Sequence, residues 1–222
     1  MAAPMILSSP VFVLGFTCIF VVICFCRLLY VTNNLGKVKA KHRHKVKTLI
    51  VAGSGGHTTE VIRLLGSMSN VYSPRVYVYA NTDKMSEDKI RTFEENKTTE
   101  GESSEYIIEK IPRSREVRQS YLTSIVSTLY ATLFAFFIVF KHSPDLLLVN
   151  GPGTCIPLCA AAFVMRLLGV KPVVQVYVES ICRVQHLSLS GLIMYYFADH
   201  LIVQWPSLKE KYPKALYLGR VV

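Results

Sequence analysis

Two glycine-rich turns contain the residues of this sequence that are best placed to do chemistry. Each follows an apolar run, at 47–52 and 146–149, and each leads at once into a helix-like pattern. A turn of this kind lets backbone N–H groups face an anion at the helix N-terminus. The two turns predict a phosphate- or sugar-binding site formed by Gly53, Ser54, Gly55, Gly56, Thr58, Asn150, Gly151, Gly153 and Thr154.

His57 occupies the first turn of the helix that follows the first glycine turn. A histidine there points toward whatever the turn binds, and it can act as a base or as a hydrogen-bond donor. The structural alternatives are a capping or solvated histidine at 57 and an ordinary helix N-cap at Thr154. The glycines around His57 favour a catalytic role.

A third polar cluster follows the apolar run 172–178. Glu179 and Ser180 come directly after this run, and Arg183 lies within one further helical turn. Ligands of doubly wound sheets bind at the carboxyl ends of the strands, where all three clusters are expected to meet. Glu179 either forms a structural ion pair with Arg183 or joins His57 in a catalytic or hydroxyl-binding site.

The motifs disfavour a bound nucleotide cofactor. The dinucleotide fingerprint G-x-G-x-x-G requires glycine where the chain has Thr58, and the nearest ribose-binding acid, Asp83, comes late. The G-K-[ST] sequence of a P-loop is absent from the chain. The six cysteines show no zinc-binding spacing, so we expect neither a cofactor nor a metal.

Apolar runs alternate with helix-like segments along the rest of the chain. This alternation predicts an α/β fold, a Rossmann-like doubly wound parallel sheet with helices on both faces. The expected strands are 47–52, 75–80, 105–111, 146–149, 172–178, 201–205 and 215–219, and the expected helices are 57–68, 155–168 and 188–198. The charged stretch 83–105 is expected to contain both loop and helix, and its most polar part, 87–105, is expected to be a loop or a mobile insertion.

The N-terminal segment is long and apolar enough to span a membrane. Residues 1–26 carry no charged side chain, and the apolar pattern continues past Arg27. A signal peptide is the alternative, but the basic residues follow the segment rather than precede it. We expect a luminal N-terminus with a retained anchor at 1–31, a basic linker at 32–46, and a cytosolic domain at 47–222.

Residues 119–140 form a second long stretch without charge. A membrane span here would separate strands of one sheet, so we expect a helix that is either a buried crossover or an interfacial element. Arg113, Arg115 and Arg118 precede it and could hold a diphosphate or lipid headgroups. The net charge of +10 fits a membrane surface better than nucleic acid, because no nucleic-acid-binding motif appears.

The order of motifs resembles one family along nearly the whole segment after the anchor. The motifs are VAGSGGHTTE, IPRSREV, NGPGT, YVESICRV, VQWPSLKEKYP and YLGRVV. They resemble the membrane-anchoring subunits of the endoplasmic-reticulum N-acetylglucosaminyltransferase, which are similar to the N-terminal half of the bacterial peptidoglycan GlcNAc transferase. The resemblance implies the N-terminal lobe of a GT-B fold. Gly55, Gly56, His57 and Glu179 match its lipid-acceptor side.

The resemblance also implies a reaction and partners. The reaction is inverting transfer of GlcNAc from UDP-GlcNAc to dolichyl-diphosphate-GlcNAc on the cytosolic face of the endoplasmic reticulum, and the nuclear envelope is a further possible location. Because the chain leaves no room for a donor lobe, a separate soluble subunit is expected to bind UDP-GlcNAc and to supply catalysis. The expected interface with that subunit is the tail, Leu218, Gly219, Arg220, Val221 and Val222, which could equally be a last strand.

Two other functions are compatible with parts of the sequence. A pure membrane adaptor would localise its partner, touch no substrate and tolerate changes in the glycine turns. A self-sufficient NAD-dependent enzyme would need the missing third glycine at position 58.

Overall fold

The computed structural model describes residues 10–37, 45–99, 105–114, 120–151 and 153–222. The chain divides into two compact units, 1–35 and 36–222, which are treated separately. The first unit contains helix α1, Pro10–Asn33. Its residues Phe12–Asn33, with a mean hydropathy of 2.6, are long and apolar enough to cross a membrane. The expected N-terminal apolar helix is therefore present.

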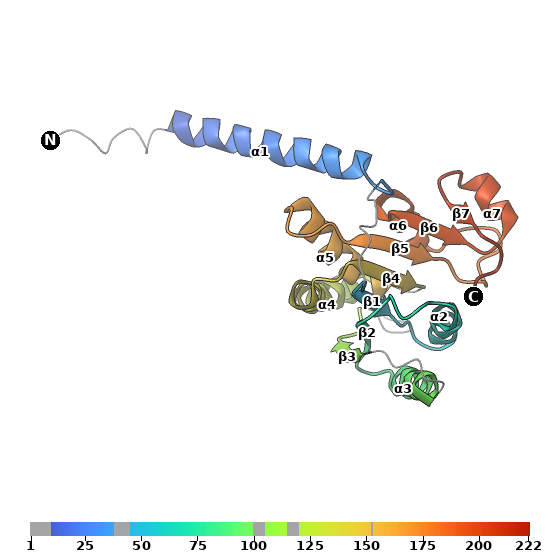
Figure 1. The fold of residues 1–222 in the computed structure, drawn as a ribbon. Helices are drawn as coiled ribbons and strands as arrows, with labels where there is room; N and C mark the ends of the chain where they lie inside the picture. Colours follow the sequence, from blue (N-terminus) through green and yellow to red (C-terminus); the bar gives the residue numbers. More distant parts are fainter. Residues whose placement is uncertain (1–9, 38–44, 100–104, 115–119, 152) are drawn as a thin grey trace. The chain divides into compact units, whose positions relative to one another are not determined.

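The second unit is a seven-stranded parallel sheet in the order β3-β2-β1-β4-β5-β6-β7 (Figure 1). The strands are β1 Thr48–Val51, β2 Arg75–Ala80, β3 Tyr106–Ile111, β4 Leu146–Asn150, β5 Val174–Val178, β6 His200–Val203 and β7 Leu216–Tyr217. The helices are α2 Gly56–Gly66, α3 Lys84–Thr99, α4 Tyr121–His142, α5 Cys155–Leu167, α6 Leu189–Phe197 and α7 Pro206–Lys211. The order reverses between β1 and β4, which is the arrangement of a doubly wound sheet. The predicted fold class is confirmed.

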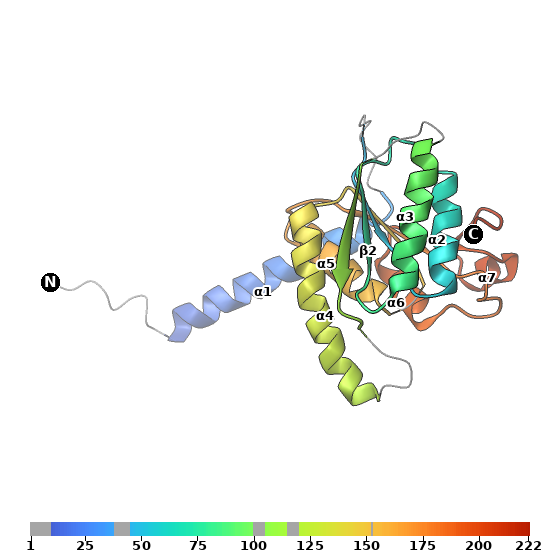
Figure 2. The ribbon, with the colours of Figure 1, turned by 90° about the horizontal axis from the view of Figure 1, so that it is seen from below.

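The sheet is covered on both faces, which explains why its strands are apolar at successive positions. On β1, Leu49 and Val51 pack in one buried cluster with α4 and α5, while Ile50 packs in the other cluster with α2. Figures 1 and 2 show α2 and α3 together on one face and α4 and α5 on the opposite face. The free cysteines Cys155 and Cys159 are buried in α5, and burial raises the pKa of the Cys155 thiol to about 12.

The expectation of a loop at 87–105 was wrong for the part that the structure describes. Residues Lys84–Thr99 form the helix α3, and Ile90 on its inner face is buried. The pattern was hidden because a charged residue also points inward: Glu94 accepts a hydrogen bond from Arg75 at 3.1 Å and another from the Tyr77 hydroxyl. A charged helix can therefore dock on a sheet when the sheet supplies the partners.

Helix α4 cannot be a membrane span, although its residues Thr123–His142 have a mean hydropathy of 1.9. Strand β1 precedes it, β4 follows it, and the two strands pair directly with Thr48 opposite Leu146. Both ends of α4 therefore lie on the same side of any membrane. Its buried side is made of small and aliphatic residues, Ala131, Ala135, Ile138 and Val139, and its N-terminal half runs past the end of β3 (Figure 2).

The last residues fold back against the sheet after the edge strand β7. The backbone N–H of Val221 donates to the Gln204 side chain at 2.9 Å, and Val222 joins a buried cluster. The guanidinium of Arg220 lies 4.2 Å from the centre of the Trp205 ring. The short helix α7 was not predicted; Pro206 at its start is a usual first helical residue.

Candidate active site

A cavity of about 360 Å³ opens at the carboxyl ends of β4 and β5 and at the start of α2. It brings together parts of all three clusters predicted from the sequence. The residues that line it are Gly56, His57, Glu60, Gly151, Glu179, Ser180, Cys182, Arg183 and Ser188. Parallel strands end at the same edge of a sheet, so segments more than 90 residues apart meet here.

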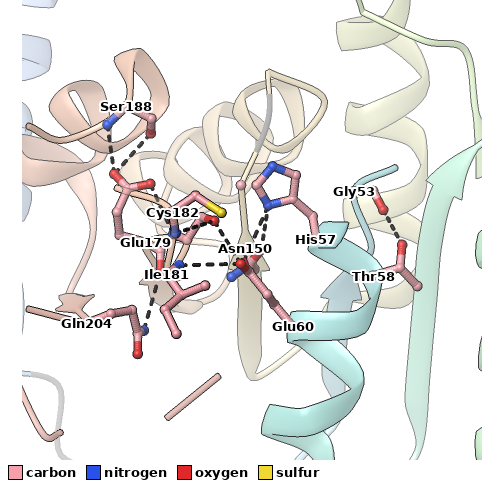
Figure 3. Close-up of polar contacts among 12 residues, drawn as sticks. Gly53, His57, Thr58, Glu60, Asn150, Glu179, Ile181, Cys182, Ser188 and Gln204 are labelled. Atoms are coloured by element: carbon pink, nitrogen blue, oxygen red, sulfur yellow. Dashed lines mark hydrogen bonds and ion pairs between the residues drawn. The ribbon is translucent and has the colours of Figure 1, made fainter. Parts of the chain in front are cut away.

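His57 is held by the second glycine turn. Its Nδ1 lies 2.9 Å from Oδ1 of the buried Asn150, as Figure 3 shows. Gly151 has a φ of +89°, and a Cβ at this position would lie only 2.3 Å from His57 Nδ1. The imidazole is therefore packed directly over the Gly151 backbone, and only glycine leaves room for it.

Glu60 is a residue of the site that sequence reasoning missed. It lies one turn after His57 on α2, and its Oε2 is 3.6 Å from His57 Nδ1. Its Oε1 accepts hydrogen bonds from Ser180 Oγ at 2.8 Å and from the backbone N–H of Ile181 at 3.3 Å. The i, i+3 spacing from His57 was the available signal, because such residues share one helix face.

The Glu179 carboxylate is engaged by groups of the protein itself. Its Oε2 accepts from Ser188 N at 2.9 Å and from Ser188 Oγ at 3.0 Å, and its Oε1 accepts from Ser180 N at 3.2 Å. A Cβ at Gly191 would lie 2.2 Å from Oε2. The carboxylate thus sits at the N-terminus of α6, where the helix dipole favours negative charge.

Burial raises the pKa of the Glu179 carboxyl above its ordinary value, while the hydrogen bonds from Ser188 and Ser180 lower it. The Tyr177 hydroxyl donates to Gly151 O at 3.1 Å and lies 3.0 Å from Ser188 Oγ. Burial also raises the pKa of Tyr177. The Tyr177 contacts connect the start of α6 to the second glycine turn, and Ser188 also binds Glu179. Glu179 therefore helps to hold these two segments together, in addition to lining the cavity.

The first glycine turn holds its shape by an internal network. Gly55 occupies the N-cap position of α2 with a φ of +68° and no side-chain capping bond. The buried Thr58 hydroxyl donates to Gly53 O and lies 2.6 Å from Ser86 Oγ. Asp83 accepts from Ser86 N and Ser86 Oγ, so it caps α3. The Thr58 side chain is occupied within the turn, whereas Ser54, Gly55 and Gly56 are exposed.

The other predicted residues fall at several places. Arg183 is exposed and lines the cavity, whereas Thr154 takes the N-cap position of α5 without making a capping bond. Arg113 is half-buried ahead of α4, and Arg115 and Arg118 lie outside the described residues. In the part of the chain that the structure describes, no group of three or more His, Cys, Asp or Glu residues is placed to hold a metal ion.

The fold is that of one Rossmann-like lobe of a GT-B glycosyltransferase. It is similar to the crystal structure of Acinetobacter baumannii MurG, with a TM-score of 0.54 and 15% identity over 78% of this chain. The similar region is 45% of that structure, so this chain corresponds to about half of it. At this level of identity the likeness concerns the fold alone.

The chain belongs to the Alg14 family, because the family profile described as "Oligosaccharide biosynthesis protein Alg14 like" matches residues 48–221. It is 53% identical to the mouse UDP-N-acetylglucosamine transferase subunit ALG14, over 91% of this chain and 94% of the mouse protein. It is 54% identical to the human protein of the same name, over 81% of this chain and 85% of that protein. The resemblance inferred from the ordered motifs is confirmed.

Proposed function

We propose that this chain is the membrane-anchoring, acceptor-side subunit of a split UDP-GlcNAc transferase. Together with a soluble donor-binding subunit, it adds GlcNAc to dolichyl-diphosphate-GlcNAc on the cytosolic face of the endoplasmic reticulum. The observation that carries this proposal is the fixed imidazole of His57 in the cavity of a single glycosyltransferase lobe. The chain's relatives are named as subunits of a UDP-GlcNAc transferase, which supports the same conclusion.

In the proposed reaction, the 4-hydroxyl oxygen of the acceptor GlcNAc attacks C1 of the donor sugar from the face opposite UDP. A new C–O bond forms, the bond between C1 and the UDP oxygen breaks, and UDP leaves with that electron pair. His57 takes the hydroxyl proton at Nε2, because its Nδ1 is turned to Asn150. The exposed backbone of Gly55 and Gly56 at the start of α2 is suited to the acceptor diphosphate.

A membrane location is supported by exposed apolar side chains on α4 and α6. Helix α5 packs against both helices. The exposed residues are Ile125, Val126, Leu129, Leu133 and Phe137 on α4, and Leu189, Leu192, Ile193 and Tyr196 on α6. Lys141 lies over the Phe137 ring and Lys214 over the Tyr196 ring. Apolar side chains bordered by lysines and a tyrosine are typical of a surface that rests in a lipid headgroup layer.

We assign residues 1–31 to the luminal N-terminus and anchor, 32–46 to the basic linker, and 47–222 to the cytosolic domain. The boundary between compact units at Leu35 and the candidate span at Phe12–Asn33 support this division. We assign the interface with the donor-binding subunit to the C-terminal tail. The exposed side chains of Leu216, Tyr217 and Leu218 at the edge of the sheet favour it.

The variant His57→Ala tests the proposed function in the reconstituted pair of subunits. Transfer should fall by about 10²- to 10⁴-fold, the usual contribution of a general base, while membrane association and subunit assembly stay intact. The measurement is GlcNAc transfer to a dolichyl-diphosphate-GlcNAc acceptor in vesicles. A pure adaptor would keep its activity, so an unchanged rate would exclude the acceptor-side role of His57.

A further inference from the structure

The two carboxylate oxygens of Glu60 are in different environments within the cavity. It is nearly buried, and one carboxylate oxygen is held by Ser180 and Ile181. The other oxygen, Oε2, is 3.6 Å from His57 Nδ1 and has no hydrogen-bond partner among the described residues. The carboxylate is thus fixed at one end and turned toward the imidazole at the other, as Figure 3 shows.

The second carboxylate of the cavity is not available in this way. Both oxygens of Glu179 accept hydrogen bonds from Ser188 and Ser180. Of the two cavity carboxylates, Glu60 is therefore the one with an oxygen left to act on the imidazole. A buried carboxylate oxygen without a hydrogen bond is costly unless a nearby positive or polarised group compensates it.

The Asn150 amide and the Glu60 carboxylate beside the imidazole together favour one tautomer of His57. A neutral imidazole carries its proton on either Nδ1 or Nε2. The Asn150 amide could serve either form, since it offers an oxygen or an NH₂ group. The Glu60 carboxylate can only accept, so its negative charge favours a proton on Nδ1. The separation of 3.6 Å is too long for a hydrogen bond, and the carboxylate acts through its charge.

We propose that Glu60 is the positioning residue for His57 in the transfer reaction. It holds the proton on Nδ1, which leaves the Nε2 lone pair to take the acceptor hydroxyl proton, and it stabilises the imidazolium formed when the new C–O bond closes. This inference rests on the proposed function of His57 as the base. Carboxylate–histidine pairs of other enzymes work by the same principle.

The variant Glu60→Gln changes this interaction with little change in shape. The Gln oxygen can replace Oε1 as the acceptor for Ser180 and Ile181, while its NH₂ group replaces Oε2 and faces Nδ1 as a donor. His57 should shift to the tautomer protonated on Nε2. The kcat of the assembled transferase should fall at least about tenfold, and KM for the acceptor should stay close to that of the unaltered protein.

The tautomer is read from ¹⁵N–¹H correlation spectra of the full chain, labelled with [¹⁵N]histidine and held in detergent micelles. The variant His57→Gln assigns the His57 signals. Glu95→Gln, the same chemical change on the exposed face of α3, is the matched control and should alter neither the tautomer nor kcat. The double variant Glu60→Gln with Asn150→Asp moves the carboxylate to the other neighbour of Nδ1, and it should restore the Nδ1–H tautomer and part of kcat.

The outcomes separate this inference from the proposed function. An unaltered chain whose His57 is protonated on Nε2 overturns the inference without any variant, and so does a Glu60→Gln variant that keeps both tautomer and kcat. A changed tautomer with an unchanged kcat overturns the role of Glu60 in transfer. The proposed function fails separately, if His57→Ala retains full transfer activity.

Discussion

Gly151 is the residue on which the orientation of His57 depends most directly. It combines a φ of +89° with a backbone that lies against the imidazole. A side chain here would meet two obstacles, the strain of a left-handed conformation and a collision with the ring. The first obstacle lowers stability and the second displaces the His57 ring, so, if His57 is the proposed base, a substitution should affect activity more than folding.

We predict that Gly151→Ala reduces transfer activity by at least about tenfold while lowering the free energy of unfolding by about 1–2 kcal/mol. The colliding atoms belong to the His57 side chain, which can rotate away, so the fold survives. Gly66→Ala is the control, because Gly66 has open space around its Cβ position and lies at the far end of α2. Thermal unfolding and transfer assays on both variants check the prediction; equal activities would contradict it.

At this scale the sequence predicted which residues meet but not how they bond. His57, Gly151, Ser180 and Arg183 were placed at one edge because each lies in the segment that follows a parallel strand. The pairing of Glu60 with His57 depends on the rotation of α2 about its axis. The engagement of Glu179 by Ser188 depends on a nine-residue separation across a loop. Neither is visible in the order of strands and helices.

Among the elements, α3 and α4 show two ways in which amino-acid composition alone misleads: α3 is a packed helix rich in charge, and α4 is an apolar helix that does not cross a membrane. The sequence of α3 suggested a loop because two charged residues, Glu94 and Lys97, lie on its buried side. The ion-pair partner of Glu94 is Arg75, which belongs to β2 and is distant in sequence. Helix α4 is long and apolar enough for a membrane span because its buried and exposed sides are both apolar. The expected order of strands already argued against a span, and the pairing of β1 with β4 places both ends of α4 on the same side of any membrane. The strands were predicted well because local runs of apolar residues define them.

The exposed side of α4 gives a prediction at the scale of an element. We expect the double variant Leu129→Glu with Leu133→Glu to fold normally, because both side chains are more than 60% exposed. Charged groups on this surface oppose its contact with lipid. Transfer to a long-chain acceptor embedded in vesicles should therefore fall by about tenfold or more, since each charge costs on the order of 1 kcal/mol or more at a lipid interface.

A short-chain, water-soluble acceptor separates lipid contact from catalysis in the same variant, which should use it at the normal rate. Met85→Glu is the matched control, since Met85 is similarly exposed but belongs to α3 on the opposite face of the sheet. If the double variant lost activity equally on both acceptors, α4 would have a role other than contact with lipid.

At the scale of the whole molecule, the fold is one lobe where a GT-B enzyme has two. The similar structure of MurG is about twice as long as the region that this chain matches. The glycine turns, His57 and Glu60 line the cavity, which is the acceptor site in the proposed function. We infer that the donor nucleotide is bound mainly by the partner subunit.

We predict that the purified full chain has no measurable transfer activity alone and becomes active when the donor-binding subunit is added. Removal of the tail residues 218–222 should weaken that assembly, which co-purification from membranes can measure. The same removal takes away the bond from Val221 to Gln204, so circular dichroism must first show that the fold is retained. Activity of the isolated chain would refute the split arrangement.

The pairing of β1 with β4 also governs the order of events during synthesis. Strand β1 cannot pair with β4 until Leu146, the partner of Thr48, has been synthesised 98 positions later in the chain. At about 5–20 residues per second, the ribosome needs roughly 5–20 s to supply that partner. The N-terminal helix has by then already emerged and can enter the membrane, while the apolar strands β1 and β2 still lack one side of their sheet. The nascent domain is thus most vulnerable to aggregation before residue 150 is made.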